Sequence, residues 1–456
     1  MSKRFSFKGG INLPRNKNQT EQCAIEVFPP PSFIAIPLQQ HIGTIAHPIV
    51  KRGDHVTIGQ LIGEPAEQDS LAVHSSVSGE VQSIGLFPHP SGRNILAIEI
   101  INDFRDDKAN IQPFSRPWRE AAPEELIQKI QSSGIAGMSG DGTPTHLKLL
   151  PSSNKTIKTL IINGVECEPY FSSDLRLIIE KTKDLLNGVL IVKKITGAKE
   201  VLIAIEDKRT TVSQSLSSLL SDSQFKEIFQ VRIQPKYPNG SEHQLVNSIM
   251  KKDIPSGGST ADIGCMVLNV ATVIAIHDAI VDGNPLYQRV ISVCGPTIRS
   301  PKNLLVRIGT PIREVLDYCK IDLKETKKII MGGPMTGLSQ SDLDTPIIKT
   351  TTGLFCFDQV TPALETSPCI NCGNCVEVCP INLIPAEITR FIKQNKLRKA
   401  IDWDIMACIE CGCCAYSCPA KINLVHYIKL GKFNIQRESS MTRSEQYVLS
   451  KGIISK

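Results

Sequence analysis

Eight of the chain's 15 cysteines form two copies of one spacing pattern in the C-terminal quarter. Each copy reads C-x2-C-x2-C-x3-C-P. The first copy contains Cys369, Cys372, Cys375 and Cys379, and the second contains Cys408, Cys411, Cys414 and Cys418. Closely spaced thiolates followed by a Cys-Pro pair are typical of proteins that bind two [4Fe–4S] clusters. The residues therefore predict one-electron transfer.

In such proteins the fourth cysteine of each copy binds the cluster of the other copy. On that logic cluster I is held by Cys369, Cys372, Cys375 and Cys418, and cluster II is held by Cys408, Cys411, Cys414 and Cys379. Structural zinc usually takes two C-x2-4-C pairs, which is a different pattern. A disulfide framework suits small secreted chains. We interpret Cys413, between two ligands, as a spare thiol.

A glycine-rich stretch at residues 134–148 is the first candidate for binding a nucleotide. Gly137, Gly140 and Gly142 would let backbone N–H groups approach a phosphate, and Lys148 would neutralise its charge. The stretch fits neither the Rossmann nor the P-loop spacing. The alternative is a simple turn.

Three more polar segments belong to the same part of the chain. Residues 161–170 follow a predicted buried strand, at the carboxyl edge where ligands bind in α/β proteins. The other two segments are residues 237–242 and 269–272. Carboxylates and amides there could hydrogen-bond an isoalloxazine ring or a ribityl chain, although solvated loops are the alternative. Together with the glycine stretch, and upstream of two clusters, they favour a flavin site.

Composition narrows the class of protein. A chain of 456 residues suggests about three domains. No segment approaches ~18 uninterrupted apolar residues, so no membrane-spanning helix is predicted. The first residues lack the apolar core of a secretory signal. Unpaired cysteines indicate a reducing compartment, hence the cytoplasm.

The net charge of +6 is concentrated after Arg390. Such a basic surface could dock an acidic redox partner or lie near anionic lipid. The alternative is a solvated helix face. Nucleic-acid binding is not expected, because no reader motif is visible and aromatic residues are few.

Periodicity and turn residues predict a multidomain α+β chain. Strand alternation at 31–105 resembles the barrel-sandwich hybrid of biotinyl and lipoyl domains, without their modifiable lysine. Strands at 159–163 and 200–205, with a helix at 124–132 and another at 175–190, indicate an α/β domain. A smaller unit has strands at 290–294, 304–308 and 328–331 and a helix at 312–318. The predicted domains are an extended arm (1–30), the β domain (31–105), a linker (106–120), the α/β domain (120–285), the small unit (286–345), a helical two-cluster domain (360–430, mostly helical at 385–402) and a basic tail (431–456).

These motifs together resemble the C subunit of the Rnf (also called Rsx) membrane electron-transport complex. The glycine stretch, the Asn-Gly-Val-Glu-Cys-Glu-Pro sequence at 163–169 and the Tyr-Pro-Asn-Gly-Ser-Glu sequence at 237–242 are also similar to the NADH- and FMN-binding subunit of respiratory complex I. Residues 7–14 resemble the opening of Rnf C subunits, and the Gly-Gly-Pro-Met sequence at 332–335 matches as well. The resemblance covers about residues 5–430.

The resemblance implies a peripheral subunit on the cytoplasmic face of the inner membrane. It would take electrons from NADH through FMN and pass them singly through two [4Fe–4S] clusters to partner subunits, and the whole complex would couple this transfer to ion transport. Ferredoxin is another implied partner. Residues 286–345 would be a soluble-ligand-binding β-grasp (SLBB) domain. The implied phosphate-side contacts are Gly137, Gly140, Gly142 and Lys148; the flavin-ring and ribityl contacts are Asn163, Glu166, Tyr237, Gly240, Glu242, Asn269 and Thr272; and Glu168 faces the nicotinamide nucleotide.

The glycine stretch departs from the family sequence Gly-x-Gly-Gly-Ala-x-Phe-Pro at Ser139, Asp141 and Thr143. Asp141 would place negative charge beside the phosphate. Ser139 adds a Cβ where the backbone must come close, and Thr143 removes an aromatic stacking surface. One alternative is therefore an iron–sulfur relay and docking subunit with a degenerate nucleotide site. Another is part of a complex that reduces a redox-sensing regulator.

Overall fold

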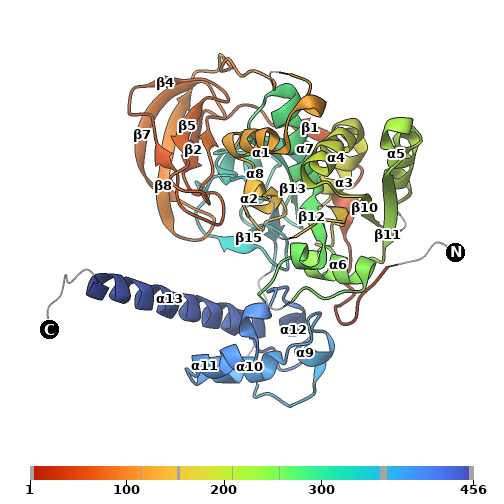
Figure 1. Cartoon of the computed structure of the whole chain (residues 1–456). Coiled ribbons are helices and arrows are strands. Elements are labelled where there is room, and N and C mark those ends of the chain that lie inside the picture. The colour runs from red at the N-terminus through yellow and green to blue at the C-terminus, as the bar shows by residue number, and fades with distance from the viewer. Residues whose placement is uncertain are drawn as a thin grey trace. The chain divides into compact units, whose positions relative to one another are not determined.

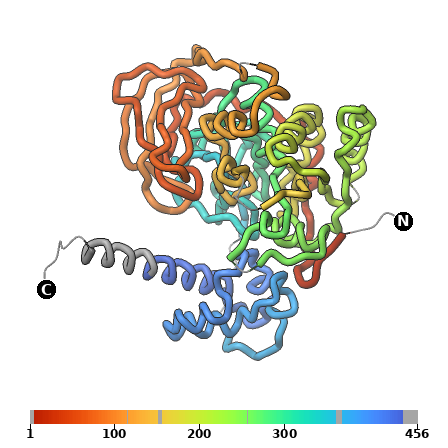
Figure 2. Tube along the Cα trace, in the orientation of Figure 1, coloured from red at the N-terminus to blue at the C-terminus, as the bar shows by residue number. Residues whose placement is uncertain are grey.

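The computed structural model describes residues 5–114, 116–150, 155–207, 209–255, 257–359 and 367–450, with side chains as far as residue 438. The chain divides into two compact units, each of which combines segments that are distant in sequence. Figure 1 shows the elements and Figure 2 traces the chain. The first unit comprises Met1–Phe5, Pro14–Pro235 and Thr260–Val360, and the second comprises Ser6–Leu13, Lys236–Ser259 and Thr361–Lys456. No helix among the described residues has the length and apolar character needed to cross a membrane.

The predicted β domain is confirmed as two small sheets (Figure 1). One has the strand order β2-β8-β7-β4 and the other the order β3-β5-β6. In β8 the fully buried Ile98 and Ile100 alternate with more exposed residues, as period-two patterning requires. In β2 every residue after Phe33 is buried. The strands are β2 (Phe33–Pro37), β3 (His47–Pro48), β4 (His55–Val56), β5 (Leu61–Glu64), β6 (Val73–His74), β7 (Gly79–Pro88) and β8 (Asn94–Asn102).

The α/β domain has a parallel sheet with the order β11-β10-β9-β12. The strands β9, β10 and β12 have buried central apolar runs, as expected for a sheet covered by helices, whereas the edge strand β11 contains exposed and polar positions. Asn163 and Asn269 are partners in register at the carboxyl ends of adjacent strands, so the sheet brings two predicted site residues together. The strands are β9 (Thr159–Gly164), β10 (Glu200–Glu206), β11 (Ile228–Ile233) and β12 (Cys265–Asn269), and the helices are α1 (Pro123–Ser132), α2 (Thr145–Leu149), α3 (Ser173–Glu180), α4 (Thr182–Thr196), α5 (Thr210–Leu220) and α7 (Val270–His277).

One predicted helix of this domain is broken. Residues 175–190 fall in α3 and α4, which are separated at Lys181, where φ is −121° and ψ is 31°. The Thr182 hydroxyl donates a hydrogen bond to the carbonyl of Ile178 at 2.6 Å. Threonine bonds of this kind compete with the helical backbone and bend helices, whereas apolar periodicity continues across the break.

The small unit contains every element predicted for 286–345, but its sheet is larger. The order is β1-β14-β13-β17-β15-β16. The arm supplies β1, which pairs parallel with β14 and covers its edge, and β17 lies beyond residue 345. The elements are β1 (Ile25–Val27), β13 (Gln288–Cys294), β14 (Lys302–Arg307), α8 (Ile312–Tyr318), β15 (Lys328–Met331), β16 (Leu338–Gln340) and β17 (Gly353–Phe357).

The second unit is mainly helical. The predicted helix at 385–402 is two helices, because Asn395 adopts a left-handed φ of 54° between them. The predicted basic tail from residue 431 continues a helix as far as Ser450. Residues 6–13 join this unit through reciprocal backbone bonds between Ile11 and Tyr237 at 2.9 and 3.0 Å (Figure 2). Its helices are α6 (Glu242–Met250), α9 (Asn374–Glu377), α10 (Pro385–Lys393), α11 (Leu397–Asp402), α12 (Cys413–Tyr416) and α13 (Leu424–Ser450).

Candidate functional site

The second unit contains a cavity of about 170 Å³ whose lining includes four cysteines. They are Cys369, Cys372 and Cys375 from the first motif and Cys418 from the second. This is the set predicted for cluster I. Cys369 and Cys372 are exposed, whereas Cys418 is buried. The donor set and the enclosed space fit a four-thiolate cluster that lies near the protein surface.

The other four cysteines also gather. Burial raises the pKa of the Cys414 thiol, and the neighbouring charges of Cys408, Cys411 and Cys379 raise it further. Cys379 from the first motif therefore lies among three cysteines of the second. Backbone N–H groups already point at two of these sulfurs: Leu383 donates to Cys379 Sγ at 3.3 Å and Glu410 to Cys408 Sγ at 3.4 Å. Such bonds tune the potential of a cluster.

The two cysteine motifs have the same local structure. Gly373 and Gly412 follow the second cysteine of each motif, with φ values of 79° and 80°. Each glycine is the N-cap of a short helix, α9 or α12, that begins at the next residue. A residue with a Cβ disfavours this left-handed conformation, so glycine at this position lets the chain turn around each group of thiols.

The glycine stretch forms a closed loop in the first unit. The Gly137 N–H donates to Thr143 O at 2.8 Å, and the Gly142 N–H donates to Gly137 O at 3.3 Å. Among the described residues, none accepts a hydrogen bond from the N–H of Ser139, Gly140 or Asp141. Successive free N–H groups form an anion-binding nest, so the loop fits a phosphate. Of the three predicted glycines, only Gly140 offers an unengaged N–H.

Asp141 opposes this fit. Its carboxylate lies against the loop backbone, because a Cβ built on Gly137 would lie 2.2 Å from Asp141 Oδ1. The Ser139 hydroxyl donates to the same oxygen at 3.2 Å. Both residues are departures from the family sequence, so the loop holds a negative charge of its own beside the free N–H groups. The fourth predicted phosphate contact, Lys148, lies on α2 directly after the loop.

A network of buried polar groups lies at the carboxyl ends of β9 and β12. Asn269 donates to Asp174 Oδ2 at 2.7 Å and caps α7 by accepting from the Ala271 N–H at 2.8 Å. Glu166 accepts hydrogen bonds from the Asp174 N–H and the Ser173 hydroxyl, each at 3.2 Å. Burial, and then the charge of Glu166, raises the pKa of Asp174. The Asn163 side chain accepts from the Val165 N–H at 3.0 Å.

Thr272 connects this network to the glycine loop. Its hydroxyl accepts a hydrogen bond from the Met138 N–H at 3.0 Å. The structure therefore brings together Asn163, Glu166, Asn269, Thr272 and the glycine loop, as the sequence predicts. Tyr237, Gly240 and Glu242 belong to the second unit, where the Tyr237 hydroxyl donates to Cys411 O at 2.8 Å. Their predicted contact with a flavin stays a prediction.

Glu168 binds a different loop. Its carboxylate accepts hydrogen bonds from the Met335 N–H at 3.1 Å and the Thr336 hydroxyl at 2.6 Å. Burial raises its pKa, and these two bonds oppose the rise. A Cβ on Gly333 would lie 2.2 Å from the Glu168 side chain, so a larger residue there would have to displace the carboxylate. Contact of this carboxylate with a nicotinamide nucleotide would require the loop at 333–336 to release it.

Four charged residues of this region were missed by sequence reasoning. Lys17 donates to Phe171 O at 2.6 Å and lies 3.4 Å from Glu166 Oε2. Asp174 follows two serines and resembles an ordinary helix start. Arg289 stands in the apolar strand β13, and a charge inside a buried strand was the available signal. Lys349 stands in a coil segment with no motif.

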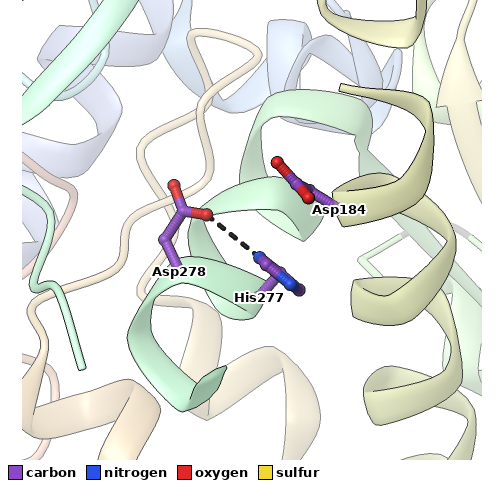
Figure 3. A group of neighbouring side chains, drawn as sticks. All are labelled: Asp184, His277 and Asp278. Atoms are coloured by element: carbon purple, nitrogen blue, oxygen red, sulfur yellow. Dashed lines mark hydrogen bonds and ion pairs between the residues drawn. The ribbon is translucent and has the colours of Figure 1, made fainter. Parts of the chain in front are cut away.

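A separate polar cluster joins α4 to the end of α7 (Figure 3). Asp184, His277 and Asp278 place ligand-type atoms within 4.8 Å of one another, and His277 Nδ1 lies 3.1 Å from Asp278 Oδ1. Lys181 Nζ lies 3.2 Å from Asp184 Oδ2 and supplies positive charge to this cluster. We therefore interpret it as an ion-pair network.

This network predicts a pH dependence of stability. Burial lowers the pKa of His277, but the hydrogen bond and charge of Asp278 outweigh burial and raise it overall. Stabilisation by the charged ring is thus complete below about pH 6.5 and is lost as pH rises through the folded pKa. We expect the stability difference between wild type and His277→Gln to shrink from about pH 6 to about pH 8 in urea unfolding. An equal difference at both pH values would contradict the ion-pair interpretation. The other charges facing His277 are Lys181, Asp184 and Asp282.

Family models match three parts of the chain. Residues 5–105 match the RnfC barrel sandwich hybrid domain, residues 130–278 the Nuo51 FMN-binding domain and residues 368–422 the 4Fe-4S dicluster domain. A chain from the crystal structure of an NAD⁺-reducing [NiFe]-hydrogenase in the H2-reduced state is similar in fold. Its TM-score is 0.50 at 16% identity, and the match covers 70% of this chain and 62% of that one.

Three relatives match over nearly the whole chain, and each is the C subunit of its complex. The subunit from the proton-translocating ferredoxin:NAD(+) oxidoreductase complex of Clostridium ljungdahlii is 39% identical, over 93% of each chain. The one from the ion-translocating oxidoreductase complex of Rhodobacter capsulatus is 39% identical, over 96% of this chain and 84% of the relative. The one from the Na(+)-translocating ferredoxin:NAD(+) oxidoreductase complex of Acetobacterium woodii is 37% identical, over 95% and 98%. The structure also gathers two sets of four cysteines and contains a glycine loop with free N–H groups. Together with these matches, this shows that the chain belongs to the C-subunit family of Rnf-type ion-translocating oxidoreductase complexes.

Proposed function

We propose that this chain is the electron-relay subunit of an Rnf-type complex, which connects NADH through FMN and two [4Fe–4S] clusters to partner subunits. The observation that carries the proposal is the cavity lined by three cysteines of one motif and one of the other. Thiols exchanged in this way place two clusters close together, which single-electron transfer requires. The whole complex would couple this transfer to ion transport.

The cysteines take the roles that their grouping supports. Cluster I is held by Cys369, Cys372, Cys375 and Cys418, and cluster II by Cys408, Cys411, Cys414 and Cys379. Exposure of Cys369 and Cys372 leaves cluster I open to a redox partner. The Lys432 ammonium donates to Cys408 O at 2.9 Å and to Glu410 Oε1 at 2.7 Å, so a charged pair would lie beside cluster II.

The flavin is assigned to the first unit. The N–H groups at 139–141 would hold the phosphate, with Lys148 near it. Asn163, Glu166, Asn269 and Thr272 would orient the ring and ribityl chain from the strand ends. Tyr237, Gly240 and Glu242 are further flavin contacts that the family resemblance implies. Bound FMN supplies the conversion between two-electron and one-electron transfer. Glu168 would position the nicotinamide nucleotide after releasing the loop at 333–336.

The remaining parts of the proposal concern the small sheet domain, the cellular location and the partners. The six-stranded sheet around α8 would be the SLBB β-grasp domain of the family. The subunit would be peripheral, at the cytoplasmic face of the inner membrane, bound to other subunits of the complex and exchanging electrons with ferredoxin through them. The basic residues after Arg390 support docking on an acidic partner or an anionic membrane.

Asp141 favours one alternative. A chain whose loop carries its own carboxylate could be an iron–sulfur relay whose nucleotide site has decayed. Flavin content separates the two: after gentle purification, the proposed function requires about one FMN per chain, and decay requires none.

The proposed function is tested by anaerobic NADH addition to protein reconstituted with iron, sulfide and FMN. We expect the flavin absorbance to bleach within about a second of mixing in a stopped-flow experiment. A chain that retains FMN but does not bleach would refute NADH input. The same protein with dithionite in place of NADH controls for a flavin that no donor can reduce.

A further inference from the structure

Two buried cations hold the glycine loop from behind. Lys349 is 1% exposed, and its ammonium donates at 2.7 Å both to Gly134 O and to Ala72 O. Gly134 has a left-handed φ of 66°, and a Cβ there would lie 2.6 Å from Lys349 Nζ. The lysine therefore connects the β domain to the first residue of the glycine stretch.

Arg289 acts at the next turn of the same stretch. It is 3% exposed; its Nη2 donates to Met138 O at 3.2 Å, and its Nη1 donates to Lys349 O. The Met138 N–H is held by the Thr272 hydroxyl at 3.0 Å. The N–H and the carbonyl of Met138 are therefore both hydrogen-bonded to buried side chains. Met138 directly precedes residues 139–141, whose N–H groups are free.

We propose that Lys349 and Arg289 are positioning residues for the phosphate of FMN. By binding the carbonyl oxygens of Gly134 and Met138, they keep acceptors away from the ligand side and leave the N–H groups of residues 139–141 to face it. They also place two positive charges behind a loop that binds a dianion. This inference rests on the proposed flavin function and assigns part of it to residues outside the loop.

Burial makes the charged form of Lys349 unfavourable, which a role in stability alone does not explain. Burial lowers its pKa to about 7, so the fold holds this lysine at a cost in free energy. Burial and the Lys349 charge lower the pKa of His41 to about 4 and of His74 to about 3, so both rings are neutral near pH 7. Asp69 lies beside His41, and Arg289 retains its charge with a pKa of about 10.

A pH profile follows from these groups. Lys349 is charged below about pH 7 and becomes neutral above it, while a flavin phosphate is dianionic above about pH 7. Over this range Lys349 changes charge close to the loop, whereas the two histidines are already neutral and Arg289 and Asp69 stay ionised. Asp174, which acts electrostatically on Arg289, has a pKa raised to about 7 by burial and by the charge of Glu166, and it gains negative charge over the same range. FMN affinity should therefore fall as pH rises from about 7 to about 9.

Lys349→Met tests the proposal, with Arg307→Gln as a matched control that removes a half-buried cation paired with Asp106. FMN and riboflavin, which lacks the phosphate, are titrated by flavin fluorescence. Near pH 6.5 we expect Lys349→Met to weaken FMN binding about tenfold or more and riboflavin binding about twofold or less, and to reduce the pH dependence to the part that Asp174 contributes. Equal losses for both flavins, or wild-type FMN affinity in the variant, would overturn the proposal. Arg289→Lys, which keeps the charge but loses the forked geometry, is measured in the same way if Lys349→Met does not fold.

Hydrogen exchange without flavin separates failure of this inference from failure of the flavin function. We expect faster exchange at Gly137 and Gly142, whose N–H groups close the loop, and unchanged exchange in β9. If the wild type binds neither flavin, the proposed flavin function is wrong. In that case, unchanged hydrogen exchange at Gly137 and Gly142 in the variants would show that the positioning role is wrong as well. Faster exchange in β9 shows that a variant is globally destabilised. The other of the two variants, Lys349→Met or Arg289→Lys, is then used to test the proposal.

Discussion

Replacing Cys418 with alanine is expected to remove one [4Fe–4S] cluster and leave the other intact. Iron and sulfide should fall from about eight to about four of each per chain. Cys418 belongs to the second motif by sequence, yet it lines the cavity with Cys369, Cys372 and Cys375. The cluster that is lost should therefore be the one bound by the first motif.

A pair of double variants shows which cluster is lost. If Cys372 and Cys418 bind the same cluster, Cys372→Ala with Cys418→Ala still leaves about four iron atoms, whereas Cys411→Ala with Cys418→Ala leaves almost none. Ligation without exchange predicts the reverse. Cys413→Ala is the matched control, because this thiol is buried beside the ligands but is not assigned to either cluster. It should retain both clusters.

Replacing Asp141 with alanine is expected to tighten FMN binding about tenfold. The carboxylate lies against Gly137, beside the free N–H groups that would hold the phosphate. A dianionic phosphate must either displace this carboxylate or bind near it. Removal of one exposed negative charge a few ångströms away is worth about 1 kcal/mol or somewhat more.

Asp141→Asn separates charge from size, since it keeps the shape of the side chain. If charge dominates, the asparagine variant should gain most of the affinity, and the gain should shrink as salt is added. Asp107→Ala, at an exposed position in the predicted linker, controls for a general change in net charge. Affinity equal to the wild type in both Asp141 variants would contradict the account of the loop.

Much of this architecture was visible in local sequence. The cysteine spacing predicted both groups of four, because the ligands of each motif lie within a few residues and only the fourth is exchanged. The strands β9 and β10 and the loop between α1 and α2 were predictable from apolar runs and glycines, whereas β12 was not predicted. Asn163 could be placed at the carboxyl edge of the sheet, and the structure adds Asn269 beside it at the end of the neighbouring strand.

What the sequence did not reveal depends on distant partners. Arg289 and Lys349 reach the glycine loop from positions more than a hundred residues later, and neither belongs to a motif. The strand β1 was read as part of an extended arm because its pairing with β14 cannot be seen locally. The break at Lys181 was not predictable, because the apolar periodicity continues through it. The Thr182 hydroxyl bends the backbone there by bonding to the preceding turn. The contact between the Asp141 carboxylate and Gly137 depends on the closed conformation of the loop, which the sequence does not show.

The most direct test of the electron-relay account is chemical analysis of anaerobically purified protein for iron, acid-labile sulfide, zinc and FMN. The account predicts about eight iron and eight sulfide per chain, about one FMN and negligible zinc. Zinc at the cysteine motifs, or cystine bridges among them with no labile sulfide, would contradict it.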